Sequence, residues 1–207
     1  MTISHSPAPA RSDVAAATPG TTTSPTRPFL LHGRVLSAGA LAWSASILTV
    51  GQDPHGTVGL AVFGVGSGLF QVGLLFLLRV LWRTRALGDG RIARGMLRFE
   101  AFAVAMAMAS TFVDAIGISD LSEPAWLALD LFWPLSMLGM FLIGIRIAVA
   151  GRWTGLSRFW PMVAESWAVV TIPAMGVFGE EAGKYVGALH LLVGYTVLGA
   201  IVSRKTD

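Results

Sequence analysis

Six long apolar segments dominate the chain and restrict what it can fold into. They cover approximately residues 31–51, 57–80, 97–118, 125–148, 159–178 and 182–203. Each can form a helix that crosses a hydrocarbon core of about 30 Å, because such a helix needs about 20 residues. A segment in lipid must satisfy its backbone hydrogen bonds internally, and a helix does so. We therefore predict an all-α integral membrane bundle of six transmembrane helices with short loops, formed by residues 29–203.

The composition agrees with this class of protein. The 207 residues are 54% hydrophobic and 13% charged, with a mean hydropathy of +0.66, which is far too apolar for an ordinary soluble domain. The chain has no cysteine, so disulfides, a thiolate nucleophile and cysteine metal ligands are excluded. No other residue pattern points to a cofactor or a metal, and we expect neither.

The two ends of the chain differ from the apolar region. Residues 1–28 are rich in Ser, Thr, Pro and Ala and have no hydrophobic periodicity, so we predict a disordered tail. No apolar stretch closely follows the initiator Met, and the first hydrophobic segment is therefore expected to remain as an uncleaved anchor. Residues 204–207 are expected to form a short second tail.

Basic residues gather in alternate connections. Those of the connection between the second and third segments, with its borders, are Arg79, Arg83, Arg85, Arg91, Arg94 and Arg98. Those around the connection between the fourth and fifth segments are Arg146, Arg152 and Arg158. The charged residues of the other three connections are Asp53, Asp120, Glu123, Glu180, Glu181 and Lys184. Cytoplasmic loops carry an excess of Arg and Lys, so both termini are predicted in the cytoplasm.

The basic residues follow this topology and do not form a nucleic-acid site, so we expect no nucleic-acid partner. Arg83, Arg85, Arg91 and Arg94 could also bind anionic lipid headgroups, since each cation near such a surface contributes about 1 kcal/mol. The simpler interpretation is that they only set the topology.

Four carboxylates within the segments are candidate functional residues. Glu100 and Glu165 are expected in an inner layer, and Asp114 and Asp130 in an outer layer with His190 near them. Ionisable groups in membrane helices are costly and usually face the bundle interior or a water-filled cavity. Two interpretations are open. Either a layer binds a solute or shuttles protons, or the residues are buried ion pairs and snorkelling groups that fix helix register.

Glu165 is expected close to the inner surface. A helix that starts near Phe159 places it about 9 Å from the inner boundary. Helical side chains lean toward the N-terminus, and Arg158 lies on the same face. We therefore predict that Glu165 snorkels to the surface or pairs with Arg158.

Two prolines lie deeper in the segments. Pro134 and Pro173 should kink the fourth and fifth helices, because proline removes a helical hydrogen bond and clashes with the preceding turn.

A stripe of small and polar residues follows one face of the second segment. Gly64 and Gly68 have the small-xxx-small spacing that lets membrane helices approach closely. Ser67 and Gln71 extend the stripe and are expected to form hydrogen bonds between helices. The glycines lie inside an apolar segment and not after a strand, so a phosphate-binding loop is excluded.

An intramembrane hydrolase would pair Ser67 with His190, which is on the last helix at a similar depth. This arrangement departs from rhomboid proteases, in which the serine belongs to a Gly-x-Ser-Gly motif on the fourth helix. Here the residue two before Ser67 is Val65. We expect no catalytic residues and no enzymatic activity.

The stretch FLIGIRIAVAGRWTGLSRFWPMVAESW contains a Gly-Arg-Trp turn, an Arg-x-x-Pro helix start and a following Trp. These residues are Gly151, Arg152, Trp153, Arg158, Pro161 and Trp167. The pattern resembles uncharacterised small six-helix membrane proteins of actinobacteria. The resemblance implies a multi-pass protein of the bacterial cytoplasmic membrane and carries no known activity.

Three functions remain, in this order. The first is a non-enzymatic membrane component that acts through lipid, a protein partner or a second copy of itself. The alternative is a small transporter or channel that uses the intramembrane carboxylates. An intramembrane hydrolase is a distant third.

Overall fold

The computed structural model describes residues 2 and 27–205, and the regular structure of this part of the chain is entirely helical. The predicted disordered tail of residues 1–28 therefore lies almost wholly outside the described residues. The eight helices are α1 Leu30–Val50, α2 Gly56–Arg83, α3 Arg91–Ala115, α4 Pro124–Asp130, α5 Phe132–Ala150, α6 Leu156–Glu165, α7 Trp167–Phe178 and α8 Glu180–Ser203.

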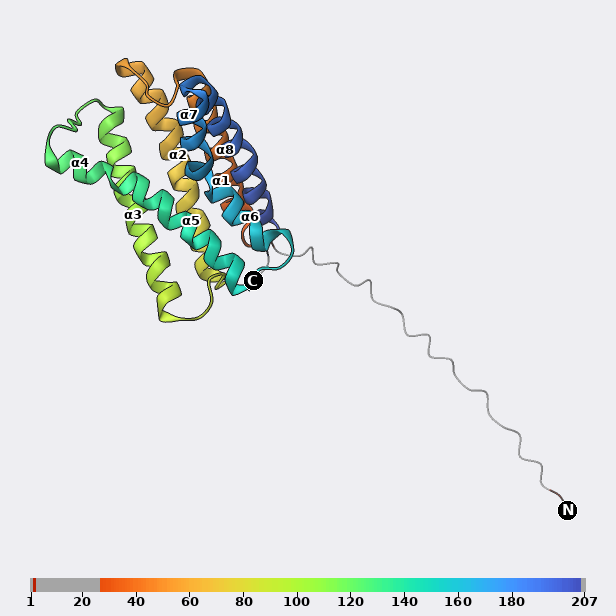
Figure 1. The fold of residues 1–207 in the computed structure, drawn as a ribbon. Helices are drawn as coiled ribbons and strands as arrows, with labels where there is room; N and C mark the ends of the chain where they lie inside the picture. The colour runs from red at the N-terminus through yellow and green to blue at the C-terminus, as the bar shows by residue number, and fades with distance from the viewer. Residues whose placement is uncertain (1, 3–26, 206–207) are drawn as a thin grey trace.

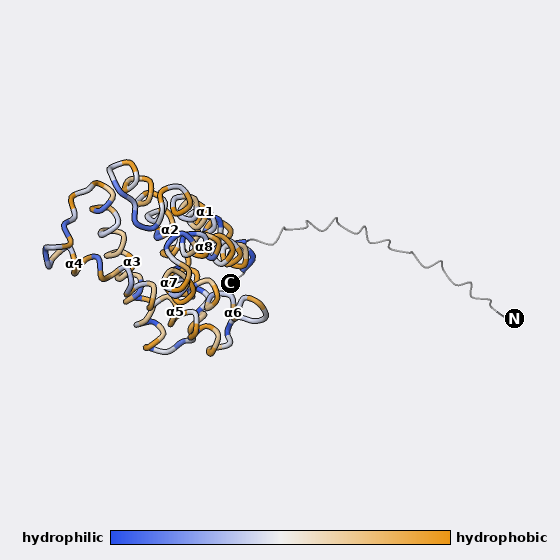
Figure 2. The backbone as a smooth tube through the Cα atoms, turned by 45° about the horizontal axis from the view of Figure 1, so that its top comes forward, coloured by the Kyte–Doolittle hydropathy of each residue, from blue (hydrophilic) through white to orange (hydrophobic). Residues whose placement is uncertain are grey.

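Five helical stretches are long and apolar enough to cross a membrane. They are α1, α2, α3, α8 and the stretch that combines α4 with α5. A sixth exists if α6 and α7, which meet at a bend of 42°, count as one broken span. Hydrophobic residues follow the helices, and hydrophilic ones gather in the connections (Figure 2). The sequence-based prediction of an all-helical protein with several helices long and apolar enough to span a membrane is confirmed.

The outer surface of the helices is apolar. Val65, Phe112 and Val193 are all more than half exposed. A soluble protein rarely exposes so many large apolar side chains in one continuous region. This surface is suited to contact with lipid.

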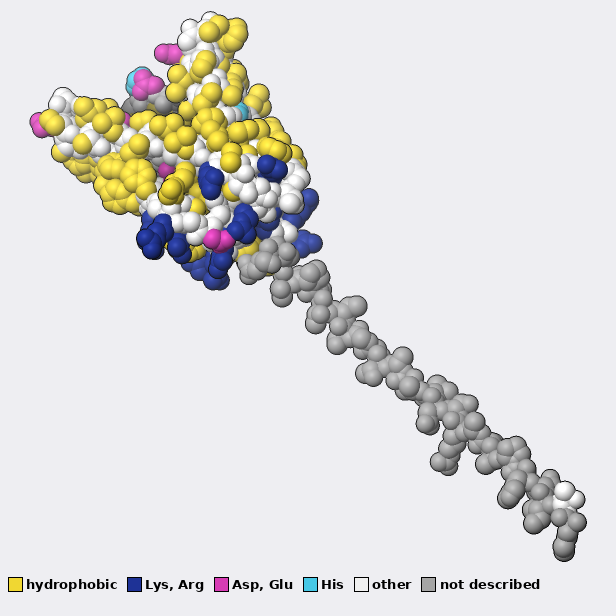
Figure 3. Space-filling model, turned by 60° about the horizontal axis from the view of Figure 1, so that its bottom comes forward, with side chains coloured by type: hydrophobic (Ala, Val, Ile, Leu, Met, Phe, Trp, Pro, Cys, Tyr) yellow, Lys and Arg dark blue, Asp and Glu magenta, His cyan; other side chains and the backbone are white. Residues whose placement is uncertain are grey.

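The helices form a bundle with α1 between α2 and α8 (Figure 1). α5 crosses beside α3 and packs on α6, while the short α4 projects from one end. The first residues of α1 and the last of α8 meet, since the Ser203 hydroxyl donates to the Leu30 carbonyl at 3.4 Å. We call this end the basic end, because Lys and Arg side chains gather there (Figure 3). The opposite end, with Asp120, Glu123 and the start of α8, is called the acidic end.

Glycines let α1 approach α2 very closely. A Cβ atom on Gly39 would lie 2.6 Å from the Leu69 carbonyl oxygen and 2.7 Å from the Phe70 Cα. A Cβ on Gly73 would lie 2.8 Å from the Leu36 Cα. These contacts involve backbone atoms, so a side chain at either glycine would push the helices apart.

The predicted glycine stripe of α2 is only partly a packing surface. Gly64 faces α3, where an added Cβ atom would overlap the Cβ of Ala115. A Cβ atom added to Gly68 would have no neighbour within 4 Å. The Gln71 amide donates to the Thr111 hydroxyl of α3 at 2.9 Å. Ser67 donates to the Phe63 carbonyl of its own helix at 2.8 Å, so the interhelical bond that we expected for Ser67 is absent.

One of the two prolines predicts a helix break correctly. Pro134 lies three residues after Leu131, where the predicted fourth helix divides into α4 and α5, and its missing N–H leaves the Asp130 carbonyl without the usual helical bond, whereas Pro173 lies inside an unbroken α7. The fifth span instead breaks at Ser166, whose N–H and hydroxyl both donate to the Val163 carbonyl, at 3.3 and 2.8 Å. This bond to the third preceding residue replaces the usual helical bond to the fourth and turns the chain.

Candidate functional site

Glu165 lies inside the bundle. It is the last residue of α6, which is ten residues long and begins at Leu156 near the basic end. At about 1.5 Å per residue, Glu165 is about 14 Å along this helix. Glu100 is also the tenth residue of its helix, since α3 begins at Arg91. Each carboxylate is thus the tenth residue of a helical stretch, of 25 residues for α3 and of 23 for α6 with α7, so the two lie at similar distances from the basic end.

Glu165 is buried and does not snorkel. Its side chain is 5% exposed and accepts a hydrogen bond from the Tyr195 hydroxyl, with 2.5 Å between Tyr195 Oη and Glu165 Oε2. Arg158 is bound elsewhere, because its Nε donates to the Ala148 carbonyl at 2.7 Å. The prediction that Glu165 reaches the surface or pairs with Arg158 is wrong, because Glu165 turns inward to Tyr195 and Arg158 binds a backbone carbonyl.

Glu100 is the second buried carboxylate and has fewer partners. It is 1% exposed, and neither carboxyl oxygen has a hydrogen-bond partner. Its carboxyl group occupies the space left by Gly139 of α5. Glu100 is close enough to Glu165 and to Tyr195 to interact with both electrostatically. Across residues 27–205 no ion pair includes Glu100 or Glu165.

Glu165 faces a small cavity, which we call the central cavity. Its volume is about 30 Å³, and its polar lining comes from Ser67, Gln71, Ser136, Glu165 and Tyr195. A water molecule needs about 10–15 Å³ of such space, so the cavity has room for about two.

Aromatic rings surround the central cavity. Trp43 lies at the middle of the group, with its ring centroid 4.9 Å from that of Phe70 and 5.4 Å from those of Trp133 and Trp167. The rings of Phe70 and Tyr195 are 4.7 Å apart. The sequence reading did not identify this cluster, although all three tryptophans lie well inside apolar segments and not at their ends.

A second, larger hollow lies toward the acidic end, and we call it the vestibule. It has a volume of about 190 Å³, and Gln52, Asp114 and Asp130 line it. The vestibule and the central cavity share Ser67 and Trp133 in their linings, so the two spaces are adjacent. The structure thus brings the two predicted outer carboxylates to one hollow that leads toward Glu165.

The bundle is closed between the central cavity and the basic end. The interior there is filled by apolar side chains of α2, α5 and α8 that are at most 1% exposed, including Leu77, Ile147 and Leu198. The vestibule thus adjoins the central cavity on the side of the acidic end, whereas apolar side chains fill the side of the basic end.

His190 and Lys184 lie outside this polar path. The His190 Nε2 is 3.0 Å from the Val163 carbonyl, beside the break between α6 and α7. Lys184 pairs with Glu181 at 2.9 Å. His190 is therefore not a partner of Asp114 or Asp130, and it contacts the carbonyl at the helix break that Ser166 also binds. The bonds of Ser67 and His190 go to backbone carbonyls of different helices, and the structure offers no support for a serine–histidine pair.

Among the described residues, no group of three His, Asp or Glu side chains could hold a metal ion. The site therefore consists of carboxyl groups, a tyrosine, an amide, hydroxyls and aromatic rings. Such a set can bind protons or small cations.

A Tyr195→Phe substitution should destabilise the protein while leaving the cavity in place. It removes the donor to Glu165 Oε2 and leaves a buried carboxyl oxygen without a partner, which costs about 1–3 kcal/mol. Thermal unfolding in detergent should show a lower midpoint. The matched control is Tyr185→Phe, because Tyr185 is 51% exposed. Equal midpoints for both variants would contradict a stabilising role of the Tyr195–Glu165 bond.

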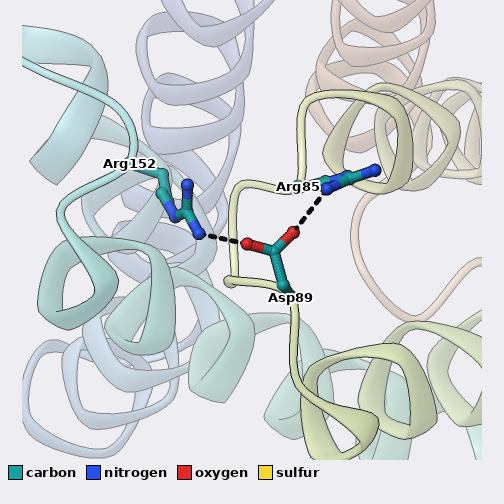
Figure 4. Close-up of polar contacts among 3 residues, drawn as sticks. All are labelled: Arg85, Asp89 and Arg152. Carbon is teal, nitrogen blue, oxygen red and sulfur yellow. Dashed lines mark hydrogen bonds and ion pairs between the residues drawn. The ribbon is translucent and has the colours of Figure 1, made fainter.

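Two of the arginines at the basic end form ion pairs with the same aspartate. Asp89 joins Arg85 of its own loop, at 3.0 Å, to Arg152 of the loop before α6 (Figure 4). Beside this bridge is a hollow of about 230 Å³ that Trp82 and Arg94 help to line. Arg85 is thus less available to bind a lipid headgroup than the sequence suggested.

Comparison with known proteins does not add to this description. No protein-family model matches the chain, and no curated protein and no solved structure was found to be similar to it.

Proposed function

We propose that this chain is a small membrane transporter that moves protons or other small monovalent cations, with Glu165 as the group that binds the charge. The observation that carries the proposal is the position of Glu165. It is a buried carboxyl group with one unpartnered oxygen, it lies at a helix break, and it faces a cavity inside the bundle that has polar groups in its lining.

Helix breaks of this kind are typical of transporters. Irregular backbone within a membrane is tolerated where it lines a cavity, and discontinuous helices form ion and substrate sites near the bilayer midplane. Both breaks in this bundle directly follow a carboxylate, at Asp130 before Leu131 and at Glu165 before Ser166. The geometry favours transport over the non-enzymatic component that the sequence ranked first.

Charge balance supports the same function. Two ionised carboxylates without a cation would be very costly in this interior, since burying one unpaired charge costs several kcal/mol. Glu100 and Glu165 have no cation from the described residues. A proton or a small cation that arrives through the vestibule would supply the missing positive charge, and the aspartates there would concentrate cations at its mouth.

We place the protein in the bacterial cytoplasmic membrane with its basic end and both termini in the cytoplasm. The excess of Arg and Lys at that end supports this orientation. The vestibule then faces the outside, and cations would enter from there.

Proton flux tests this proposal. The purified protein is reconstituted into vesicles loaded with a pH-sensitive dye, and a potassium gradient with valinomycin sets the interior negative. We expect the interior to acidify at least tenfold faster than in protein-free vesicles. Equal rates in both kinds of vesicle would contradict transport of protons.

We further propose that the basic end binds anionic lipid headgroups. The hollow of about 230 Å³, which Arg85, Asp89 and Arg94 help to line, is of a size suited to a phosphate group. Arg83, Arg91 and Arg94 are exposed at the same end of the bundle and take part in no ion pair of the described residues.

The double variant Arg91→Gln, Arg94→Gln should lose bound lipid. Each cation contributes about 1 kcal/mol near an anionic surface, so affinity for phosphatidylglycerol should fall by roughly tenfold or more. Native mass spectrometry of the detergent-solubilised protein measures the bound fraction. Lys184→Gln, at the acidic end, is the control. If both variants retain lipid equally, the basic end is not its binding surface.

A further inference from the structure

The central cavity contains buried hydrogen-bonding atoms that the described residues leave without partners. They are the acceptors Gln71 Oε1 and Glu165 Oε1 and the donor Trp43 Nε1, all from residues that line the cavity. Gln71 is 4% exposed and Glu165 is 5% exposed, so bulk water does not satisfy these atoms. An unsatisfied buried polar atom is costly, and a ligand that donates to both acceptors would remove this cost.

The aromatic lining limits the kind of ligand. Trp43, Phe70, Trp133, Trp167 and Tyr195 present π-systems that attract ammonium-type cations. A hard metal ion needs about six oxygen ligands, and this cavity supplies too few of them. An ammonium ion has N–H donors for the two acceptors and a positive charge for the carboxylate and the rings.

The size of the cavity limits the ligand further. About 30 Å³ holds roughly two water-sized molecules. An ammonium ion with one water fits this space, and methylammonium fills it. Tetramethylammonium, with five heavy atoms and no N–H donor, is both too large and unable to hydrogen-bond.

We propose that the central cavity is a binding site for ammonium or for a primary amine cation of methylammonium size. The cation donates to Glu165 Oε1 and Gln71 Oε1, and a water bound beside it accepts from Trp43 Nε1. This inference names the cation for the transport proposed above and rests on that function for passage across the membrane. Binding itself can be measured without transport.

Tryptophan fluorescence of the purified full-length protein tests the site, because three tryptophans line the cavity. Ammonium, methylammonium, sodium and tetramethylammonium chlorides are titrated at constant ionic strength. We expect a saturable change with ammonium and methylammonium, with a Kd in the millimolar range as is usual for so small a ligand. Sodium and tetramethylammonium should give none. A response without saturation, or an equal response to sodium, would overturn the proposal.

Two variants locate the signal. Glu165→Gln keeps the size of the side chain and should weaken ammonium binding at least tenfold. Trp133→Leu removes one ring of the cavity, takes away none of the side-chain hydrogen bonds of the described residues, and should weaken binding about fivefold. Trp126→Leu, whose side chain is outside the cavity, is the matched control and should bind like the unchanged protein. If Trp126→Leu lowers affinity as much as Trp133→Leu, the fluorescence does not report this cavity and the proposal fails.

The outcomes separate this inference from transport. Proton flux without saturable ammonium binding overturns the ammonium site and leaves the transporter. Ammonium binding without flux of protons or ammonium supports the site and overturns the transporter.

Discussion

The Glu165→Gln substitution is expected to lower proton flux at least tenfold while leaving the protein folded. Glutamine has nearly the same shape as glutamic acid and can still accept the hydrogen bond from Tyr195. Unlike a carboxyl group, the glutamine amide cannot bind and release a proton near neutral pH. The side-chain volume next to the cavity is unchanged, so a loss of flux would report the lost carboxyl group and not a rearranged bundle.

The dye-loaded vesicles described above measure this effect. Glu181→Gln is the matched control, because Glu181 is exposed at the acidic end, where it pairs with Lys184. Both variants should elute from size exclusion like the unchanged protein. If Glu165→Gln conducts as fast as Glu181→Gln, the carboxyl group is structural and the transport proposal loses its central residue.

Gly39→Ala is expected to cause a large loss of stability. The new methyl group would lie 2.6 Å from the Leu69 carbonyl oxygen and 2.7 Å from the Phe70 Cα, both in the backbone of α2. Neither atom can move without separating α1 from α2, and overpacking of this kind typically costs about 1–3 kcal/mol or more. Since α1 contacts both α2 and α8, the yield of folded protein should fall sharply.

Gly68→Ala isolates the cause, because it makes the same chemical change on α2 where a Cβ has no neighbour within 4 Å. Alanine has a higher helix propensity than glycine, so this variant should be as stable as the unchanged protein or slightly more so. The thermal midpoints in detergent compare the two. A midpoint for Gly39→Ala equal to that of Gly68→Ala would mean that α1 and α2 do not pack as described.

The spans could be predicted from the sequence because length and hydropathy alone determine them. The predicted segment 31–51 and α1 Leu30–Val50 differ by one residue at each end, and 182–203 and α8 share their last residue. Every long apolar segment must become a helix in lipid, whatever its neighbours are. The alternation of basic and acidic connections also predicted that Asp114 and Asp130 lie at the same depth. Both line the vestibule.

The depth of Glu165 could not be predicted in the same way. Leu156 and Ser157 precede the arginine that marks the apparent membrane edge, yet they already belong to α6. The helix is therefore about 14 Å long up to Glu165, where the sequence predicted about 9 Å, and the direction in which Glu165 points depends on the break that follows it. The break that turns it inward depends on Ser166, whereas the visible signal, Pro173, lies seven residues further on inside an unbroken helix.

The aromatic cluster depends on contacts between distant helices. Trp43, Trp133 and Trp167 come from α1, α5 and α7, and no local pattern brings them together. A usable signal did exist, since tryptophans of membrane proteins prefer the interfaces and these three lie near the middle of their segments. Tryptophan at mid-depth is a reason to expect a buried site.

Access to Glu165 is the most direct test of the central claim that the carboxyl group is reached from the acidic end. The chain has no cysteine, so Glu165→Cys introduces a single thiol. Silver ions, small enough for the central cavity, are applied to one side of vesicles, and the thiols that remain are counted with a maleimide after unfolding. A separate Glu123→Cys variant reports the sidedness. We predict reaction from the acidic end only. No reaction from either side, or reaction from the basic end alone, would contradict the account.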